Sequence, residues 1–450
     1  MIAKPEFLDR RGQPLQHPRC TRADRGRRRA AREGRTMLRW QLAVLACCVA
    51  GSAVAAEDES RTGLREWLNA SGSLRGAYFS SSRELDDRQN LGAASVWLRA
   101  APKLGDAATM TLEGWSRDDG GRRQSHLREG YINVRSGPVD LRVGQQIIAW
   151  GRADELNPTD NLSPRDFTLL TPESDDQRLG TAAARLTYHF GDYAMTAIWL
   201  PSFRSNVIPI PHTPGVDVAR QVPDGQGAAF KLERSGTRWE GSLSFYDGLD
   251  VNPDLVFLGV NQNAADLALR NHRIRVFGGD VATVAGPWGL RGEAAYTWTS
   301  YDPVMRPLVK KPFFYGVAGA DRTFDNGIYV NVQYYLRHIS NFQDPGGIGD
   351  PLLREIAVQS ALTVNQRDRF EHGLSLRLSD KWFNNTLEAE LAAVVSLTRG
   401  DQVWRPKVIY AINDQLKLTV GVDVFAGGSN TFYGRLRDNS AFYVEMKYGL

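Results

Sequence analysis

The sequence predicts an all-β protein, a transmembrane antiparallel up-and-down β-barrel of about 16–18 strands. Three observations predict it: a final strand with one apolar face, the return of the same alternation along the chain, and an export signal near the N-terminus. The apolar face of the final strand is Phe442, Val444, Met446, Tyr448 and Leu450, and the residues that alternate with it are Tyr443, Glu445 and Lys447. Such a strand suits lipid on one side and water on the other.

The period-two alternation returns in residues 328–337, 387–398 and 416–425. Each run is about ten residues long, the length with which a tilted strand crosses a bilayer. The alternative is a large soluble β-sandwich or propeller, whose strands would usually be shorter, about five or six residues. The length of the runs therefore favours the barrel.

A secretory signal peptide is expected at residues 37–56. Met37 and a basic residue precede an apolar run, and small residues then offer a cleavage site after Ala55 or Ala56. We interpret residues 1–36 as a non-native N-terminal extension, because a signal peptide normally begins at the true start of a chain. Residues 57–450 then form one β-barrel domain in the cell outer membrane.

The mature protein is expected to begin near Glu57. N-terminal sequencing of the protein extracted from membranes checks this expectation. Recovery of residues 27–29 in that product would contradict it.

Charge and cysteine content narrow the function classes. The whole chain has a formal net charge of +4, but the sign reverses without residues 1–56, because residues 1–36 are rich in arginine. No nucleic-acid partner is expected. Cys20, Cys47 and Cys48 all precede the cleavage site, so the mature chain offers no disulfide or cysteine metal site. A lipoprotein signal at Cys47 is the alternative, but the residues before it match poorly.

Strand-like segments number about eighteen, an even count that returns both ends of the chain to the periplasmic side. They lie near 68–80, 91–103, 107–117, 125–135, 138–149, 179–190, 192–201, 226–235, 237–247, 269–284, 288–300, 312–322, 326–339, 367–379, 385–398, 402–412, 415–426 and 440–450. Longer polar stretches alternate with short turns, and they are 150–178, 202–224, 249–267, 341–365 and 427–438. This asymmetry is typical of the two faces of an outer-membrane barrel.

The polar faces of the strands predict a lumen that is wet or densely ion-paired, because charges in hydrocarbon are destabilising. The expected inward cations are Arg75, Arg99, Arg142, Arg185, Lys231, Arg275, Arg291, Arg337, Arg377, Lys417 and Lys447. The expected inward acids are Glu113, Glu129, Glu233, Glu240, Glu293, Glu388, Glu390, Asp423 and Glu445. Their near balance argues against a one-sign ring that would set strong ion selectivity.

The most specific local signal is a strand that runs to Trp150 and opens into the charged loop at residues 150–178. A loop this long usually has a function. Folded inward it would be a pore constriction or a solute-binding element, and the candidate residues are Arg142, Gln146, Trp150, Arg152, Asp154, Asn157, Asp160 and Arg165. The alternatives are a structural plug and an outward lid. A metal is not expected, because the acids of the loop lack the spacing of a calcium site.

Three segments resemble a group of uncharacterised proteobacterial outer-membrane porin-like barrels, loosely similar to alginate-export barrels. They are Gly144-x-Gln146-x-x-x-Trp150-Gly151-x-x-Asp154-x-x-Asn157-Pro158-x-Asp160, Trp404-Arg405-Pro406-Lys407-Val408-x-Tyr410, and the run from Phe432 to Asn439. The resemblance implies a barrel that passes solutes or envelope material, without naming the cargo. Leu450 departs from it, standing where the group usually has a terminal aromatic residue.

The leading hypothesis is therefore a porin-like channel for small or oligomeric polar solutes, in contact with outer-membrane lipid and inserted by the outer-membrane assembly machinery. The alternative is an envelope assembly or export barrel that passes lipid or polysaccharide with periplasmic partners. An outer-membrane enzyme is the less favoured third alternative, and no enzyme is expected, because no Gly-x-Ser-x-Gly, phosphate-binding glycine loop or His-Glu-x-x-His pattern occurs. No cofactor is expected either.

Overall fold

The structure is a computed structural model that describes residues 66–85, 88–210, 215–261, 264–299 and 309–450. Residues 59–450 form one compact unit. The expected signal peptide, its cleavage site and the expected non-native extension lie outside the described residues, so those three expectations stay predictions.

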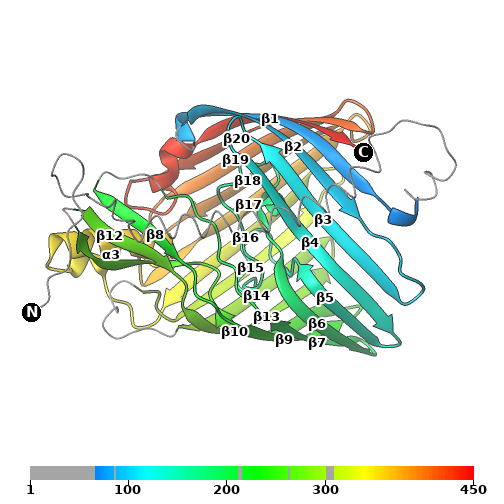
Figure 1. Cartoon of the computed structure of the whole chain (residues 1–450), viewed down its shortest axis with the longest axis horizontal. Helices are drawn as coiled ribbons and strands as arrows, with labels where there is room; N and C mark the ends of the chain where they lie inside the picture. Colours follow the sequence, from blue (N-terminus) through cyan, green and yellow to red (C-terminus); the bar gives the residue numbers. More distant parts are fainter. Residues whose placement is uncertain (1–65, 86–87, 211–214, 262–263, 300–308) are drawn as a thin grey trace, which may run out of the picture. The chain divides into compact units, whose positions relative to one another are not determined.

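Eighteen strands form one antiparallel sheet that closes on itself, because β21 pairs with β1 as well as with β20 (Figure 1). The prediction of an up-and-down barrel is confirmed. The barrel strands are β1 (Ser71–Leu85), β2 (Arg88–Ala100), β3 (Ala108–Asp118), β4 (Arg123–Ser136), β5 (Val139–Gln146), β6 (Thr181–Phe190), β7 (Tyr193–Leu200), β9 (Gly227–Ser235), β10 (Trp239–Leu249), β13 (Arg273–Ala285), β14 (Trp288–Thr299), β15 (Phe313–Thr323), β16 (Tyr329–Ile339), β17 (Phe370–Trp382), β18 (Leu387–Ser396), β19 (Gln402–Ala411), β20 (Leu416–Ala426) and β21 (Ala441–Gly449).

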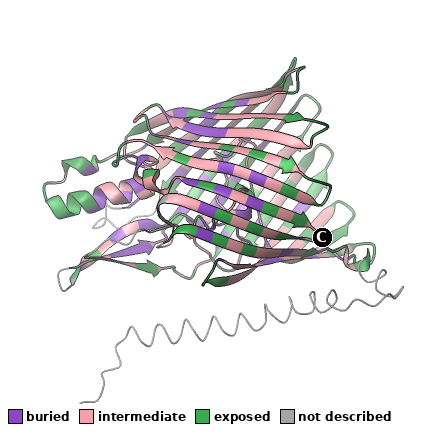
Figure 2. Ribbon diagram, turned by 90° about the horizontal axis from the view of Figure 1, so that it is seen from above, coloured by how far each residue is buried: buried purple, intermediate pink, exposed green. Residues whose placement is uncertain are grey.

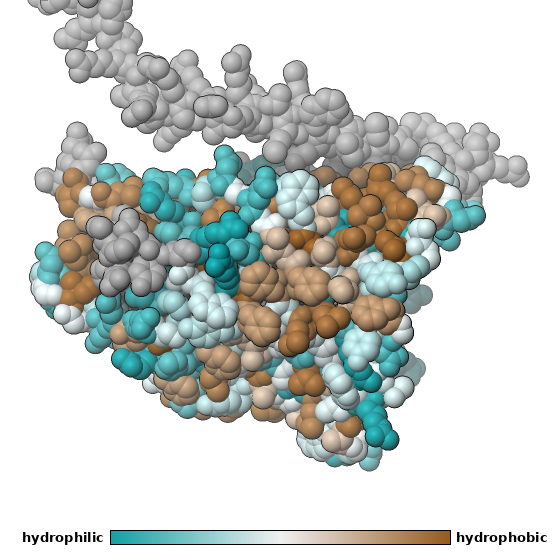
Figure 3. Space-filling model, turned by 90° about the horizontal axis from the view of Figure 1, so that it is seen from below, coloured by the Kyte–Doolittle hydropathy of each residue, from teal (hydrophilic) through white to brown (hydrophobic). Residues whose placement is uncertain are grey.

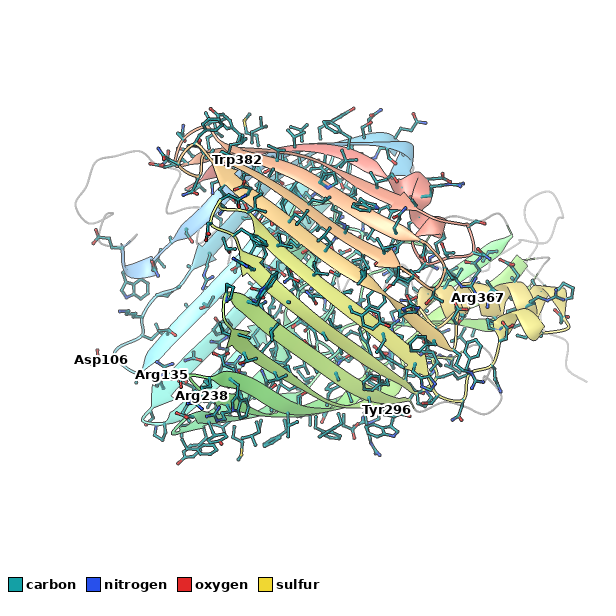
Figure 4. The ribbon with its side chains drawn as sticks, turned by 180° about the vertical axis from the view of Figure 1, so that it is seen from behind. Asp106, Arg135, Arg238, Tyr296, Arg367 and Trp382 are labelled. Atoms are coloured by element: carbon teal, nitrogen blue, oxygen red, sulfur yellow. The ribbon has the colours of Figure 1, made fainter. Side chains whose placement is uncertain are left out.

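The two ends of the barrel differ in their connections. Only short turns join the strands at one end, which we call the turn end. All the long connections lie at the other, the loop end, together with a few short ones. Figure 4 shows Asp106, Arg135 and Arg238 at the turn end, and Tyr296 and Arg367 at the loop end. Short turns face the periplasm in outer-membrane barrels, so the loop end is the external one.

The outer wall is apolar and the inner wall is polar, as the alternation predicts. Figure 2 shows exposed and buried residues alternating along the strands, and Figure 3 shows hydrophobic side chains gathered in broad patches on one face. Near the loop end, direct cross-strand neighbours on the outer wall form an aromatic row: Phe230, Phe245, Phe277, Tyr296, Phe314, His338 and Phe370. Aromatic rows of this kind mark the boundary between hydrocarbon and headgroups.

One expected inward cation faces the other way. Arg275 lies on the outer wall with Phe277, while Ile274 and Val276 face inward and are 3% exposed. Alternation around Arg275 does not distinguish the two faces, because the inner wall here is apolar. The reason for that apolar stretch is the loop that packs on it, described below.

Three of the long connections build a small cap at the loop end, where Figure 1 shows β8, β12 and α3 close together. Its elements are β8 (Val216–Gln221), β11 (Asp254–Asn261), β12 (Ala264–Arg270) and α3 (Pro351–Thr363). β12 pairs antiparallel with β11 and parallel with β8, and Leu267 packs with Ile356 and Ala357 of the helix.

Helix α3 begins where the sequence provides a cap. Asp350 accepts a hydrogen bond from the Leu353 amide, and proline occupies the first turn. The described residues also include three short 3-10 segments, η1 (Ser174–Gln177), η3 (Pro345–Gly347) and η4 (Gly434–Asn439). Within the described part of the chain, no helix is both long and apolar enough to cross a membrane.

Candidate pore constriction

The connection between β5 and β6, residues 147–180, lies inside the barrel and is called the lumen loop. It contains the 150–178 segment that the sequence singled out. Its side chains and backbone contact inward-facing residues of β1, β3, β4, β9, β10, β13, β14, β17 and β19. The loop is therefore held against opposite parts of the inner wall.

An apolar cluster seats the first part of the lumen loop. Ile148, Trp150 and Leu162 pack against inward-facing residues of neighbouring strands, namely Ala183, Ile198, Leu200, Ala229, Tyr246, Ile274, Val276 and Ala295. Trp150 is only 7% exposed. Burial of this area stabilises the loop at roughly 25 cal/mol per Å² of apolar surface. Trp150 thus anchors the first part of the loop on the inner wall.

Glu293 of β14 binds the backbone at the turn of the lumen loop. Its carboxylate accepts hydrogen bonds from the amides of Arg152 (3.0 Å), Ala153 (3.2 Å) and Thr159 (2.8 Å), and from the Thr159 hydroxyl (2.8 Å). Gly151 makes this approach feasible: its φ is +95°, and a Cβ there would lie 2.5 Å from the carboxylate. A glycine is needed at this position for both reasons.

Arg152 connects the lumen loop to an acidic section of the wall. Its guanidinium pairs with Asp280 (2.6 Å), Glu240 (2.5 Å) and Glu233 (2.7 Å), which come from three adjacent strands. The Asp280 side chain is 1% exposed. One arginine against three carboxylates leaves a local excess of negative charge, of which Lys231, 3.4 Å from Glu233, offsets a part.

Glu390 of β18 links the two arms of the lumen loop through the two basic residues that pair with it. Asp154 pairs with Arg377 (3.2 Å), which also pairs with Glu390 (2.8 Å). The other oxygen of Glu390 lies 3.3 Å from Lys407, and Lys407 lies 3.4 Å from Glu173 of the returning arm. Alternating charges thus run from one arm of the loop, through the wall, to the other arm.

The acidic end of the lumen loop, residues 173–176, lies against a basic section of the wall. Asp176 pairs with Arg75 at 2.5 Å, and the carbonyl of Asp175 accepts a hydrogen bond from Arg128 at 2.6 Å. Arg117 donates to the Leu170 carbonyl at 2.7 Å. The predicted site residues did not include Asp175 and Asp176. Their negative charge, opposite to that of Arg152, is the sequence signal that could have identified them.

Three other predicted site residues, Asp160, Arg165 and Asn157, lie in the lumen loop and differ in what they contact. Asp160 accepts from Arg178 at 2.7 Å and from the Trp150 amide at 3.4 Å. The Arg165 amide donates to Asn206 at 2.7 Å, which ties the loop to the next long connection. Asn157 is half-buried, and its side-chain oxygen is buried without a hydrogen-bond partner.

The arginines of the lumen loop stay charged at any physiological pH. Burial lowers the pKa of Arg165, and the neighbouring Arg178 lowers it further. Burial also acts to lower the pKa of Arg152, but its carboxylate partners, Asp280 first among them, raise it overall. Because an arginine ordinarily titrates above pH 12, neither shift removes the charge near neutrality.

The remaining predicted site residues, Arg142 and Gln146, lie on β5. Gln146 is fully buried and donates to the Ala183 carbonyl at 3.1 Å, so its side chain is packed within the wall. Arg142 faces the lumen on the turn side of the loop, donates to Asn133 at 3.2 Å and lies over the Tyr131 ring at 4.2 Å. Its direct neighbour across the strands is another inward arginine, Arg185.

The Arg142 and Arg185 side chains lack an acidic partner in the part of the chain that the structure describes. Like charges directly opposite each other destabilise a strand pair. The acids closest in sequence and register are engaged elsewhere: Asp140 with Arg135 at 2.7 Å, and Glu233 with Arg152 at 2.7 Å. Among the described residues, no group of three or more His, Cys, Asp or Glu side chains could hold a metal ion.

Glu293→Ala is expected to loosen the lumen loop. The loss of the carboxylate leaves three buried amides unsatisfied, which should lower the free energy of local opening by about 1–3 kcal/mol. Hydrogen–deuterium exchange of residues 150–160 measures this. Glu388→Ala is the control, because Glu388 pairs with Lys381 at 3.4 Å and makes no described contact with the loop. Equal exchange in both variants would contradict the prediction.

The fold matches solved outer-membrane proteins. No family model and no curated protein sequence matches the chain. The outer membrane protein OpdK of Pseudomonas aeruginosa has a TM-score of 0.50 at 9% identity, covering 85% of this chain and 98% of that chain. OccK5 (OpdH) of the same organism has a TM-score of 0.50 at 12% identity, covering 85% and 99%. The chain has the fold of an outer-membrane porin.

The localisation follows from the same observations. A closed barrel with an apolar outer wall is one of the two backbone arrangements that can span a bilayer, and strands of this kind are those of the outer membrane. The comparisons do not confirm the resemblance to alginate-export barrels, which stays a prediction. The assignment of a constriction to the eight predicted residues also stays a prediction.

Proposed function

We propose that the chain is a diffusion channel of the outer membrane for small polar solutes, that the lumen loop narrows its aqueous path, and that it prefers anions. Barrels of 16–18 strands leave an aqueous channel unless something occupies the lumen. The observation that carries the proposal is the attachment of the loop to both walls, through Arg152 on one side and Asp176 on the other.

The narrowing is electrostatic as well as steric. Arg152 lies in the acidic section of the wall, and residues 173–176 lie against the basic section, so a solute passing the loop moves between opposite charges. Side chains in a narrow aqueous path set ion preference through their local potential. The residues proposed to face this path are Arg152, Asp154 and Glu173.

The proposed anion preference rests on Arg142 and Arg185. Two adjacent guanidinium groups without an acidic partner raise the local concentration of anions in a low-dielectric wall. Repulsion between Arg142 and Arg185 destabilises the pairing of their two strands. Stabilisation of a passing anion gives this pair a function that offsets that cost. A carboxylate or phosphate solute fits the forked geometry of two arginines.

Planar-bilayer recording of the purified protein tests the proposal. Discrete ion-conducting steps with a reversal potential that indicates anion preference are expected. A silent barrel that co-purifies with periplasmic factors would favour the export alternative, which no described contact supports.

The double variant R142Q/R185Q is expected to lose the anion preference. Removing two unpaired cations should lower the anion-to-cation permeability ratio roughly sevenfold, because a local potential smaller by about one kT per unit charge lowers anion partitioning about threefold and raises cation partitioning by about the same factor. Reversal potentials in a low-salt gradient measure the ratio, since salt screens the effect. Arg238→Gln, at an exposed residue of the turn end, is the control. An unchanged ratio in the folded double variant would remove this pair from the conduction path.

A further inference from the structure

The outer wall carries a charged cluster that the channel function does not use. Arg273 and Arg275 of β13 and Asp247 of β10 face outward near the loop end. The two arginine side chains are 50% and 66% exposed. From this cluster we infer a binding site for the phosphate group of a lipid in the outer leaflet.

One carboxylate binds both arginines, each through its Nε atom. Asp247 Oδ1 accepts from Arg273 Nε at 2.6 Å, and its Oδ2 accepts from Arg275 Nε at 3.1 Å. The terminal nitrogens of Arg275 have no acceptor among the described residues. Those of Arg273 make one long contact, 3.5 Å to the Gln226 carbonyl. The arrangement leaves two guanidinium forks and a net positive charge facing away from the barrel.

The depth of the cluster places it among headgroups. Asp247 and Arg275 are direct cross-strand neighbours, and the outward pair next to them toward the turn end is Phe245 with Phe277, in the aromatic row. On its other side Arg275 pairs with Trp298, which is 48% exposed. Arginine on a lipid-facing wall is destabilising near the midplane and nearly neutral at the interface. The cluster therefore sits at the external edge of the apolar wall.

Phosphate is the ligand that this arrangement fits. Guanidinium forks bind phosphate oxygens by paired, charge-assisted hydrogen bonds, and a second arginine can bind the remaining oxygens. A lipid headgroup is presented at this depth by the bilayer itself, whereas a free anion gains nothing from the adjacent aromatic row. The acyl chains of such a lipid would lie along Phe245 and Phe277.

Other outward arginines near aromatic rings have their guanidinium groups covered. Arg322, toward the turn end, lies over the rings of Phe324 (4.6 Å) and Trp288 (5.6 Å). Arg234 lies over Trp239 at 4.3 Å and donates to its carbonyl at 2.9 Å. Neither shares a carboxylate with a second arginine, so neither presents two open forks.

Native mass spectrometry of the delipidated full chain tests the site, with bisphosphorylated lipid A as the probe and its dephosphorylated form as the matched lipid. The wild type is expected to bind the phosphorylated lipid preferentially. R273Q/R275Q is expected to weaken this binding about tenfold or more, because charge-assisted hydrogen bonds are lost. Arg123→Gln is the control: this exposed loop-end arginine pairs with its own acid, Asp118, at 2.6 Å.

Two further variants separate charge from geometry. R273K/R275K keeps the charge without the forks and should bind with intermediate strength. Asp247→Asn keeps both arginines and should retain binding. Inorganic phosphate at the same concentration should not displace the lipid.

Three results would overturn the site. They are equal affinity of the wild type and a folded R273Q/R275Q variant, equal binding of the dephosphorylated lipid by the wild type, or displacement by equimolar inorganic phosphate, which would indicate a free-anion site. The comparison of phosphorylated with dephosphorylated lipid A on the wild type tests the site even if a variant fails to fold.

Discussion

Deleting residues 155–172 is expected to raise the single-channel conductance roughly severalfold, because an 18-stranded barrel without an inserted segment leaves a wide aqueous path. The structure makes this deletion practical. Asp154 and Glu173, which would flank a short glycine linker, both lie next to partners of Glu390. The new connection therefore spans a short distance, and recordings in planar bilayers measure the result.

A milder change serves as the comparison for the deletion. D154N/E173Q keeps the length of the lumen loop but removes its ion pairs with Arg377 and Lys407. Its conductance should lie between those of the wild type and the deletion variant. If the folded deletion variant conducted like the wild type, the loop would not limit the aqueous path.

Val332→Arg is expected to lower the stability of the barrel by about 2–4 kcal/mol, the loss for arginine on the lipid face near the midplane. Val332 is 42% exposed on the outer wall and pairs with Leu376. Leu376 lies midway along β17 between Phe370 and Trp382, two exposed aromatic residues at the two ends of this strand, and Figure 4 shows Trp382 at the turn end. Val332 is therefore near the centre of the bilayer.

Urea unfolding in lipid vesicles measures the loss. Val332→Leu keeps an apolar side chain on the same face, and its stability should stay within about 1.5 kcal/mol of the wild type. Equal stability of the arginine and leucine variants would argue that this wall does not face lipid.

The strands could be predicted almost completely, because the alternation of a strand is local: neighbouring side chains point to opposite sides. Each barrel strand overlaps the segment that the pattern predicted for it. Local reasoning could not give the cap. Its sheet joins β8 to β12 in parallel, and its helix packs on residues from two other connections, which are long-range contacts.

The candidate site was predictable in location and less so in detail. The alternation of side chains along a strand identifies the residues that face inward. It does not show whether another segment of the chain covers them. Asn331 faces inward, yet it is 3% exposed and accepts a hydrogen bond from Gln333, so an arginine there would disturb this packing. Trp150 and Gln146 look like lumen residues for the same reason. Their burial depends on a loop whose path a strand pattern does not contain.

The attachment of the lumen loop also bears on the order in which the protein assembles. Arg152 needs acids from β9, β10 and β13, while Asp176 needs Arg75 of β1, and Glu173 needs Lys407 of β19. These partners span most of the chain, and β1 and β19 come together only once the C-terminal strands have joined β1. An unfinished barrel would leave the charged groups of the loop without their partners. The loop therefore docks late in assembly. Its ion pairs stabilise the barrel once the first and last strands have paired.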